Sequence, residues 1–167
     1  KYSAREESKQ NSINTFNALL GMNIIPIVNE NDTVAVDEIK FGDNDNLSYI
    51  VSELIGADLL IILTDIDGYY SKNPHENPDA VLYHNISDLS EQIEAAAGGA
   101  GSKLGTGGML TKVHASRLAA ENGTNAVIAN GSDPEIIYDI LDGVEIGTLF
   151  IANTKLTDCQ TEGSLLK

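Results

Sequence analysis

Leu59-Leu60-Ile61-Ile62-Leu63 is the clearest buried strand in this sequence of 167 residues. A short run of wholly apolar residues is typical of a strand that is covered on both faces. A segment with helical spacing precedes it and stops at Gly56, and the polar stretch Thr64-Asp65-Ile66-Asp67-Gly68 follows it. The sequence therefore predicts, in this order, a helix, a glycine stop, a buried strand and a polar strand end.

The same order occurs two more times, and this repetition indicates the fold class. A helix over about residues 6–20 stops at Gly21 and precedes Ile24-Ile25-Pro26-Ile27-Val28. A later helix stops at Gly123 and precedes Asn125-Ala126-Val127-Ile128-Ala129. Alternation of this kind predicts an α/β domain with a mainly parallel sheet.

Polar residues gather at the predicted carboxyl ends of these three strands. They are Asn29 to Asp32, Thr64-Asp65 and Asn130 to Ser132. In open α/β sheets, ligands bind beyond the carboxyl ends of the strands. We therefore expect the functional site at this edge of the sheet.

Several shorter elements complete the predicted domain, which we place at residues 1–152. They are a β-rich segment from Val34 to Phe41, a surface loop from Tyr69 to Pro78, a strand at Val81-Leu82-Tyr83, a helix from Ser87 to Ala97 capped by Ser87 or Asp88, a helix from Asp133-Pro134 through Leu141, and a strand at Gly147 to Ile151. Residues 153–167 have little periodicity, and we expect them to form a polar tail or linker.

Composition restricts the class of protein. A chain of 167 residues with 42% hydrophobic residues is long enough for one domain with a sizeable core. The net charge of −15 argues against a nucleic acid or an anionic membrane surface as a partner. The apolar runs are about five residues long, well below the roughly 20 needed to cross a bilayer. We therefore expect a soluble protein that binds neither nucleic acid nor membrane.

The cysteine and histidine residues give no sign of a metal site. Cys159 is the only cysteine, so the sequence has neither a disulfide framework nor a thiolate site. His75, His84 and His114 lack the mutual spacing of metal ligands and have no nucleophile beside them. A reducing compartment, the cytoplasm, is the simplest setting for such a chain.

A glycine-rich stretch, Leu104-Gly105-Thr106-Gly107-Gly108-Met109-Leu110-Thr111-Lys112, reads as a loop that leads into a helix. Glycine allows backbone N–H groups to approach a ligand closely, and phosphate is a natural ligand for such a loop. Lys112 falls in the first helical turn, where a cation is unfavourable unless an anion lies nearby. The spacing differs from the Walker A motif. The alternative is a glycine-rich linker beside a solvated lysine.

Acidic and amide side chains form a second candidate site, composed of Asn29, Asp32, Asp43, Asn44 and Asp45. Such a set can bind the ammonium group of an amino acid or a hard cation such as Mg²⁺. Residues 43–54 do not fit a calcium loop, because the glycine and glutamate required at its sixth and twelfth positions are missing. A simple helix cap at residues 43–46 is the alternative.

Four motifs carry a resemblance to a known family. They are Asn29-Glu30-Asn31-Asp32, Gly42-Asp43-Asn44-Asp45-Asn46-Leu47, Leu63-Thr64-Asp65-Ile66-Asp67-Gly68-Tyr69-Tyr70 and Gly105-Thr106-Gly107-Gly108-Met109-Leu110-Thr111-Lys112. Over about residues 10–152 the chain resembles the glutamate 5-kinases of the amino acid kinase superfamily. The resemblance implies a three-layer sandwich and ATP-dependent phosphorylation of the γ-carboxylate of L-glutamate, the first step of proline biosynthesis. It also implies ATP with Mg²⁺, and we expect a homo-oligomer.

The resemblance assigns roles to individual residues. The catalytic residues are Lys112 and Asp45. The glutamate-binding positions are Asn29, Asp32, Asp43, Asn44 and Asp45. The ATP-binding positions are Thr64, Asp65, Thr106, Gly107, Gly108, Met109, Leu110, Thr111 and Lys112. No residue is assigned as a metal ligand.

The resemblance also implies a part that is absent before Lys1. Family members begin with a strand that carries a lysine, followed by a glycine-containing phosphate-binding turn. We therefore expect this chain to be the carboxyl-terminal part of a catalytic domain and to be inactive alone. Two alternatives stay open: a related kinase acting on aspartate, acetylglutamate, carbamate or a nucleotide monophosphate, and a non-catalytic module that binds nucleotide or amino acid.

Overall fold

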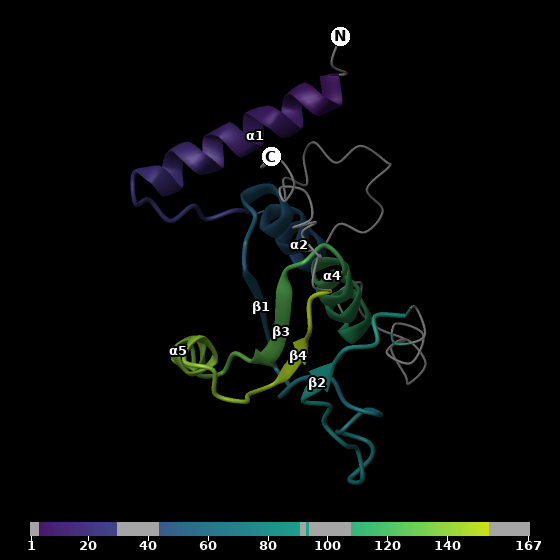
Figure 1. Ribbon diagram of the computed structural model, residues 1–167. Helices are drawn as coiled ribbons and strands as arrows, with labels where there is room; N and C mark the ends of the chain where they lie inside the picture. The colour runs from purple at the N-terminus through teal and green to yellow at the C-terminus, as the bar shows by residue number, and fades with distance from the viewer. Residues whose placement is uncertain (1–3, 30–43, 91–92, 94–107, 154–167) are drawn as a thin grey trace, which may run out of the picture.

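The computed structural model describes residues 4–29, 44–90, 93 and 108–153. Its helices and strands are, in chain order, α1 (Ala4–Gly21), α2 (Asn44–Ile55), β1 (Leu59–Thr64), β2 (Asn85–Ile86), α4 (Met109–Glu121), β3 (Asn125–Asn130), α5 (Ile136–Leu141) and β4 (Thr148–Phe150) (Figure 1). The β-rich segment predicted from Val34 to Phe41 and the tail beyond residue 153 lie outside the described residues.

The four strands form one sheet in the order β1-β3-β4-β2. β1 and β3 are parallel, with Leu59 opposite Asn125 and Thr64 opposite Asn130. β2 is parallel to β4, whereas β3 and β4 are antiparallel. The predicted α/β fold with a mainly parallel sheet is confirmed, and the carboxyl ends of β1 and β3 meet at one edge.

Helices cover both faces of this sheet, so the domain has three layers (Figure 1). On one face, Val113 and Ala119 of α4 belong to a buried cluster with residues of β1, β3 and β4. On the other face, Ile140 of α5 packs with Val127 and Ala129 of β3. Because successive strand residues point to opposite faces, a strand between two helical layers must be apolar along its length.

The helix stops read from the sequence are confirmed at two glycines. Gly56 has a φ of +63° after α2, and Gly123 has a φ of +91° after α4. These positive values suit glycine, which has no Cβ to clash with the preceding carbonyl. The stops direct the chain into β1 and β3, which places Thr64 and Asn130 side by side at the carboxyl edge.

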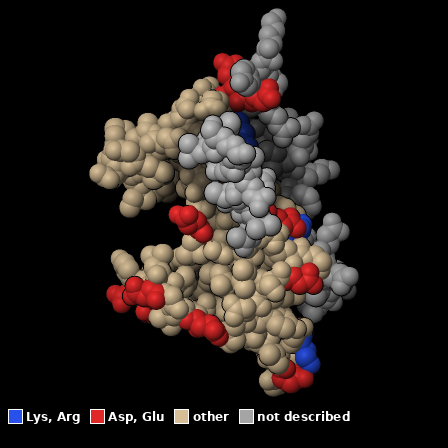
Figure 2. Space-filling model, viewed as in Figure 1, with Lys and Arg blue, Asp and Glu red and all other residues tan. Residues whose placement is uncertain are grey.

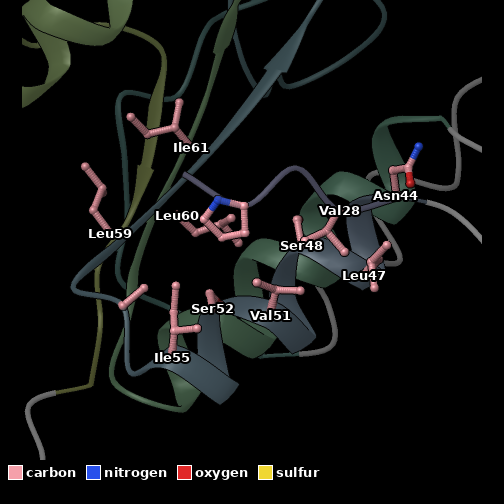
Figure 3. A pocket seen from close by; sticks show the side chains of 12 residues that line it. Val28, Asn44, Leu47, Ser48, Val51, Ser52, Ile55, Leu59, Leu60 and Ile61 are labelled. Carbon is pink, nitrogen blue, oxygen red and sulfur yellow. The ribbon is translucent and has the colours of Figure 1, made fainter. Parts of the chain in front are cut away.

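The strand predicted at Ile24–Val28 is wrong: residues 24–29 belong to no helix or strand of the described part. Ile25 and Ile27 are 87% and 98% exposed. Pro26 and Val28 line a cavity of about 540 Å³ with residues of α2 and β1 (Figure 3). The apolar pattern predicts burial, but a strand also needs a hydrogen-bonded neighbour, and Pro26 has no N–H to donate.

Two further predictions need correction. The strand predicted at Val81–Tyr83 is an isolated antiparallel bridge between Leu82 and Tyr70, so this segment closes the loop instead of joining the sheet. The sheet strand β2 comes later, at Asn85–Ile86. The helix predicted from Asp133-Pro134 is α5, which starts at Ile136; in the turn that leads into it, Asp133 Oδ1 accepts a hydrogen bond from the N–H of Glu135 (3.0 Å).

The helix predicted from Ser87 to Ala97 lies mostly outside the described residues. Residues 87–90 are not helical. Asp88 Oδ1 accepts a hydrogen bond from the N–H of Ser90 (3.0 Å), which is the contact that a capping residue makes. The predicted capping role of Asp88 stays a prediction, because most of the helix it would cap lies outside the described residues.

The molecular surface agrees with the acidic composition. On the face seen in Figure 2, Asp and Glu side chains are spread over several elements and Lys and Arg are few, as expected from the net charge of −15. Helix α1 projects from the sheet layers (Figure 1) and contacts α2 through Lys9 Nζ and Glu53 Oε1, which lie 3.0 Å apart. Among the helices described, none combines the length and the apolarity needed to span a membrane.

Two buried serines give a first testable prediction. Ser116 of α4 is fully buried, and its hydroxyl finds no hydrogen-bond partner among the described residues. Ser116→Ala is expected to raise the free energy of unfolding by about 1 kcal/mol, because it removes an unpaired buried polar group. Ser52 is the matched control, since its Oγ donates to the carbonyl of Tyr49 (2.7 Å). Urea unfolding checks both variants; Ser52→Ala should be neutral or destabilising, and a destabilised Ser116→Ala contradicts the prediction.

Candidate active site

Asp45, Thr111 and Lys112 form a polar cluster between two helices. Asp45 lies in the first turn of α2, and Thr111 and Lys112 lie in the first turn of α4. Lys112 Nζ lies 2.9 Å from Asp45 Oδ2 and 3.2 Å from Oδ1. Thr111 Oγ1 lies 2.8 Å from Asp45 Oδ2 and 2.8 Å from the carbonyl oxygen of Gly108. The packing of α2 against α4 thus joins residues that are 66 and 67 positions apart.

The ion pair is largely removed from solvent. The side chains of Lys112 and Asp45 are 15% and 12% exposed. A lysine in the first turn of a helix is disfavoured by the helix dipole, whereas an aspartate there is favoured. Asp45 therefore compensates the charge of Lys112 and holds its ammonium group in one place. The phosphate that the sequence predicts beside this lysine stays a prediction.

Gly108 precedes α4 and provides no side-chain cap. Its φ of −80° and ψ of −172° are extended values that any residue adopts, so this glycine is not required for its backbone angles. Met109 packs against the core, and Leu110 is exposed. Thr106 and Gly107 lie outside the described residues. An uncapped helix start beside a fixed ammonium group is chemically suited to bind an anion.

A second polar cluster lies at the carboxyl ends of β1 and β3. Thr64 Oγ1 donates to Asp65 Oδ1 (3.2 Å), and Asn130 Nδ2 donates to Asp67 Oδ1 (3.0 Å). The hydroxyl of Tyr70 donates to the other carboxylate oxygen of Asp67 (3.2 Å). Partial burial, followed by the charge of Asp67 and this hydrogen bond, raises the pKa of Tyr70. The expected nucleotide-binding pair Thr64-Asp65 is therefore part of a larger hydrogen-bonded edge.

The candidate glutamate-binding residues are only partly described. Asp32 and Asp43 lie outside the described residues. Asn29 is exposed at the end of the segment that follows α1, and Asn44 is exposed at the start of α2, where it lines the cavity of Figure 3. Among the candidates that the structure describes, Asp45 is the one that hydrogen-bonds to α4, through Thr111 and Lys112.

Comparison with known proteins assigns the family. Residues 2–130 match the sequence profile of the amino acid kinase family. The chain belongs to this family. It is 53% identical over 151 residues to a glutamate 5-kinase of Clostridium perfringens (strain 13 / Type A), covering 88% of this chain and 56% of that protein. It is 58% identical over 142 residues to a glutamate 5-kinase of Clostridium acetobutylicum, covering 85% of this chain and 53% of that protein. The chain thus spans about half the length of the curated relatives it matches.

A solved structure supports the amino acid kinase fold independently. The UMP kinase of Bacillus anthracis superposes with a TM-score of 0.51 at 16% identity, covering 68% of this chain and 42% of that chain. An identity this low is evidence of a shared fold and of nothing further. The three-layer architecture expected from the resemblance is present in the described part of this chain.

Sequence reasoning did not include Asp67, Tyr70 or Asn130 among the site residues of this family member. The signal for Asn130 is present in the sequence, because it directly follows the predicted buried strand at residues 125–129; in the structure it is the last residue of β3. Its hydrogen bond to Asp67 joins residues 63 positions apart and depends on side-chain geometry that no local pattern encodes. Within the described residues, no group of three or more His, Cys, Asp or Glu side chains could hold a metal ion.

Proposed function

We propose that this chain forms part of the active site of a glutamate 5-kinase, which transfers the γ-phosphoryl group of ATP to the γ-carboxylate of L-glutamate. The high identity to curated glutamate 5-kinases is the observation that carries this proposal. The two polar clusters at the sheet edge and between α2 and α4 support it chemically. The reaction would supply the first step of proline biosynthesis.

The chemistry needs positioning and charge more than proton transfer. In this reaction a carboxylate oxygen of glutamate bonds to the γ-phosphorus while the bond to the bridging oxygen breaks, which yields ADP and an acyl phosphate. The nucleophile is ionised at neutral pH, so no general base is required. Catalysis then depends on alignment and on stabilising the charge of the transferring group. Lys112 is suited to the second task and Asp45 to holding Lys112.

The remaining predicted residues divide between the two substrates. Thr64, Asp65 and the segment from Thr106 to Lys112 would hold ATP, and Asn29, Asp32, Asp43 and Asn44 would hold glutamate. Mg²⁺ would accompany ATP and neutralise phosphate charge. It is usually held by one or two carboxylates together with phosphate oxygens, and the exposed carboxylate of Asp65 at the sheet edge fits that donor type.

The cellular compartment and the oligomeric state of the enzyme are also proposals. A single cysteine, Cys159, supports a reducing compartment, and we propose the cytoplasm. The homo-oligomer expected from the sequence stays a prediction, which light scattering on the complete protein checks.

Trapping of the product tests the proposed function. The complete protein containing this chain is incubated with ATP, Mg²⁺ and hydroxylamine, which converts an acyl phosphate to a hydroxamate. L-Glutamate is expected to give γ-glutamyl hydroxamate and stoichiometric ADP, whereas L-aspartate, N-acetylglutamate, carbamate and UMP give ADP formation near the background rate. Phosphorylation of aspartate or UMP but not of glutamate would refute the assignment.

A further inference from the structure

The hydrogen bond between Asn130 and Asp67 has a role beyond the residues assigned above. We propose that Asn130 is a positioning residue for nucleotide binding: by holding the carboxylate of Asp67, it fixes the turn at residues 65–68 and thereby Asp65. This inference rests on the proposed function, in which Thr64 and Asp65 contact ATP. Neither Asn130 nor Asp67 needs to touch the nucleotide.

Asn130 is fixed relative to the end of β1. Asn130 lies opposite Thr64 in the parallel ladder, and the N–H of Gly131 donates to the carbonyl of Thr64 (2.8 Å). A Cβ at position 131 would lie 2.8 Å from the Cβ of Leu63, so the two strand ends are in close contact. The Asn130 backbone therefore forms a firm support beside the turn.

The amide of Asn130 is also oriented. Its Oδ1 accepts hydrogen bonds from the N–H of Ser132 (3.0 Å) and from Ser132 Oγ (2.7 Å). An amide oxygen has no proton to donate, so these two donors require the oxygen to face Ser132 and the NH₂ group to face Asp67. The donor is thus oriented before any ligand arrives.

The turn itself is anchored at both ends and held in its middle by Asp67. It leaves β1 at Thr64, and at its far end the N–H of Tyr69 donates to Thr148 Oγ1 of β4 (2.8 Å). A Cβ at Gly68 would lie 2.6 Å from the same Thr148 oxygen, so this end is tightly packed. Between the anchors, the Asp67 carboxylate accepts from Asn130 and from Tyr70.

Substitution of Asn130 is expected to act on the turn at residues 65–68. Because both ends of the turn keep their anchors, loss of the Asn130 contact leaves the fold intact and loosens residues 65–67. Hydrogen bonds to an ionised carboxylate are stronger than those between neutral groups. A looser turn must be ordered when the nucleotide binds, which weakens ATP binding while glutamate binding is unaffected.

Calorimetric ATP binding to the complete protein, together with steady-state kinetics, tests the inference. Asn130→Ala is expected to raise the Kd for ATP about tenfold, with the KM for glutamate and kcat at saturating ATP within about twofold of the parent. Asn130→Asp, which places two carboxylates together, should weaken ATP binding at least as much. The reciprocal exchange D67N/N130D again pairs one amide with one carboxylate and should restore the Kd to within about threefold.

A substitution in the adjoining loop serves as the matched control. Asp79→Asn makes the Asp-to-Asn change of the double variant in the adjoining loop, where Asp79 forms an exposed ion pair with Lys72 (2.6 Å), and it should leave the Kd for ATP unchanged. An unchanged Kd in Asn130→Ala, or a lowered Tm with an unchanged Kd, overturns the positioning role. A parent that binds ATP with the expected Asn130 dependence but does not phosphorylate glutamate refutes the proposed function alone.

Discussion

Lys112→Ala in the complete protein is expected to lower kcat by about 10²- to 10³-fold, with much smaller changes in the KM values for ATP and glutamate. Lys112 Nζ is held 2.9 Å from Asp45 Oδ2 at the uncapped start of α4. The negative charge on the transferring phosphoryl group shifts most during bond breaking, so a fixed ammonium group contributes most in the transition state. Initial-rate kinetics with both substrates varied measure the effect.

The removal of Lys112 also leaves the Asp45 carboxylate without its cation, and the Asp45 side chain is only 12% exposed. The loss of one partner of a buried pair destabilises a fold, so the folded fraction of each variant must be measured with its activity. Lys112→Gln keeps an N–H donor for Asp45 but no charge, and it should show the same loss of kcat with a smaller fall in Tm. Lys9→Ala is the matched control, because Lys9 forms an exposed ion pair with Glu53. Normal turnover in folded Lys112→Ala and Lys112→Gln would remove this lysine from the mechanism.

The parts of the fold that could be predicted are those with local causes. At Gly56 and Gly123 a glycine coincides with the end of a helical apolar pattern, and both signals are visible in the sequence. The structure gives both glycines a positive φ. The apolar runs of β1 and β3 follow directly and were placed correctly. Segment 24–28 has an equally apolar pattern but no ladder among the described residues. Whether an extended segment becomes a strand depends on a partner elsewhere in the chain, and no local pattern supplies that information.

The candidate site also has features that the sequence predicts and features that it does not. Asp45 and Lys112 were each selected from motif position, and the structure adds that they contact each other through the packing of α2 on α4. The structure places Thr64 beside Asn130 at the edge where the sequence predicts the ligand, and ligand binding at this edge stays a prediction. The pairing of Asn130 with Asp67 could not be predicted, because it depends on the turn conformation after β1 and on the orientation of one amide.

Gly147→Ala is expected to destabilise the protein by about 4 kcal/mol and to lower its Tm by about 10 °C. Gly147 has a φ of +72°, and a Cβ there would lie 2.2 Å from the carbonyl oxygen of Ile128 and 3.0 Å from the Cβ of Ala129. The obstacle is the backbone of the central strand β3, which cannot move without disturbing its ladders to β1 and β4. Urea unfolding and calorimetry of the complete protein measure the loss.

Gly143→Ala separates the two causes of that loss. Gly143 has a φ of +83°, close to that of Gly147, but a Cβ there meets no atom within 4 Å. Its substitution carries the backbone cost of a positive φ alone and should destabilise by about 1 kcal/mol. The difference between the two variants then measures the contact with β3. Equal destabilisation of both variants would show that backbone conformation alone requires glycine at position 147, and that β4 does not approach β3 as closely as the structure indicates.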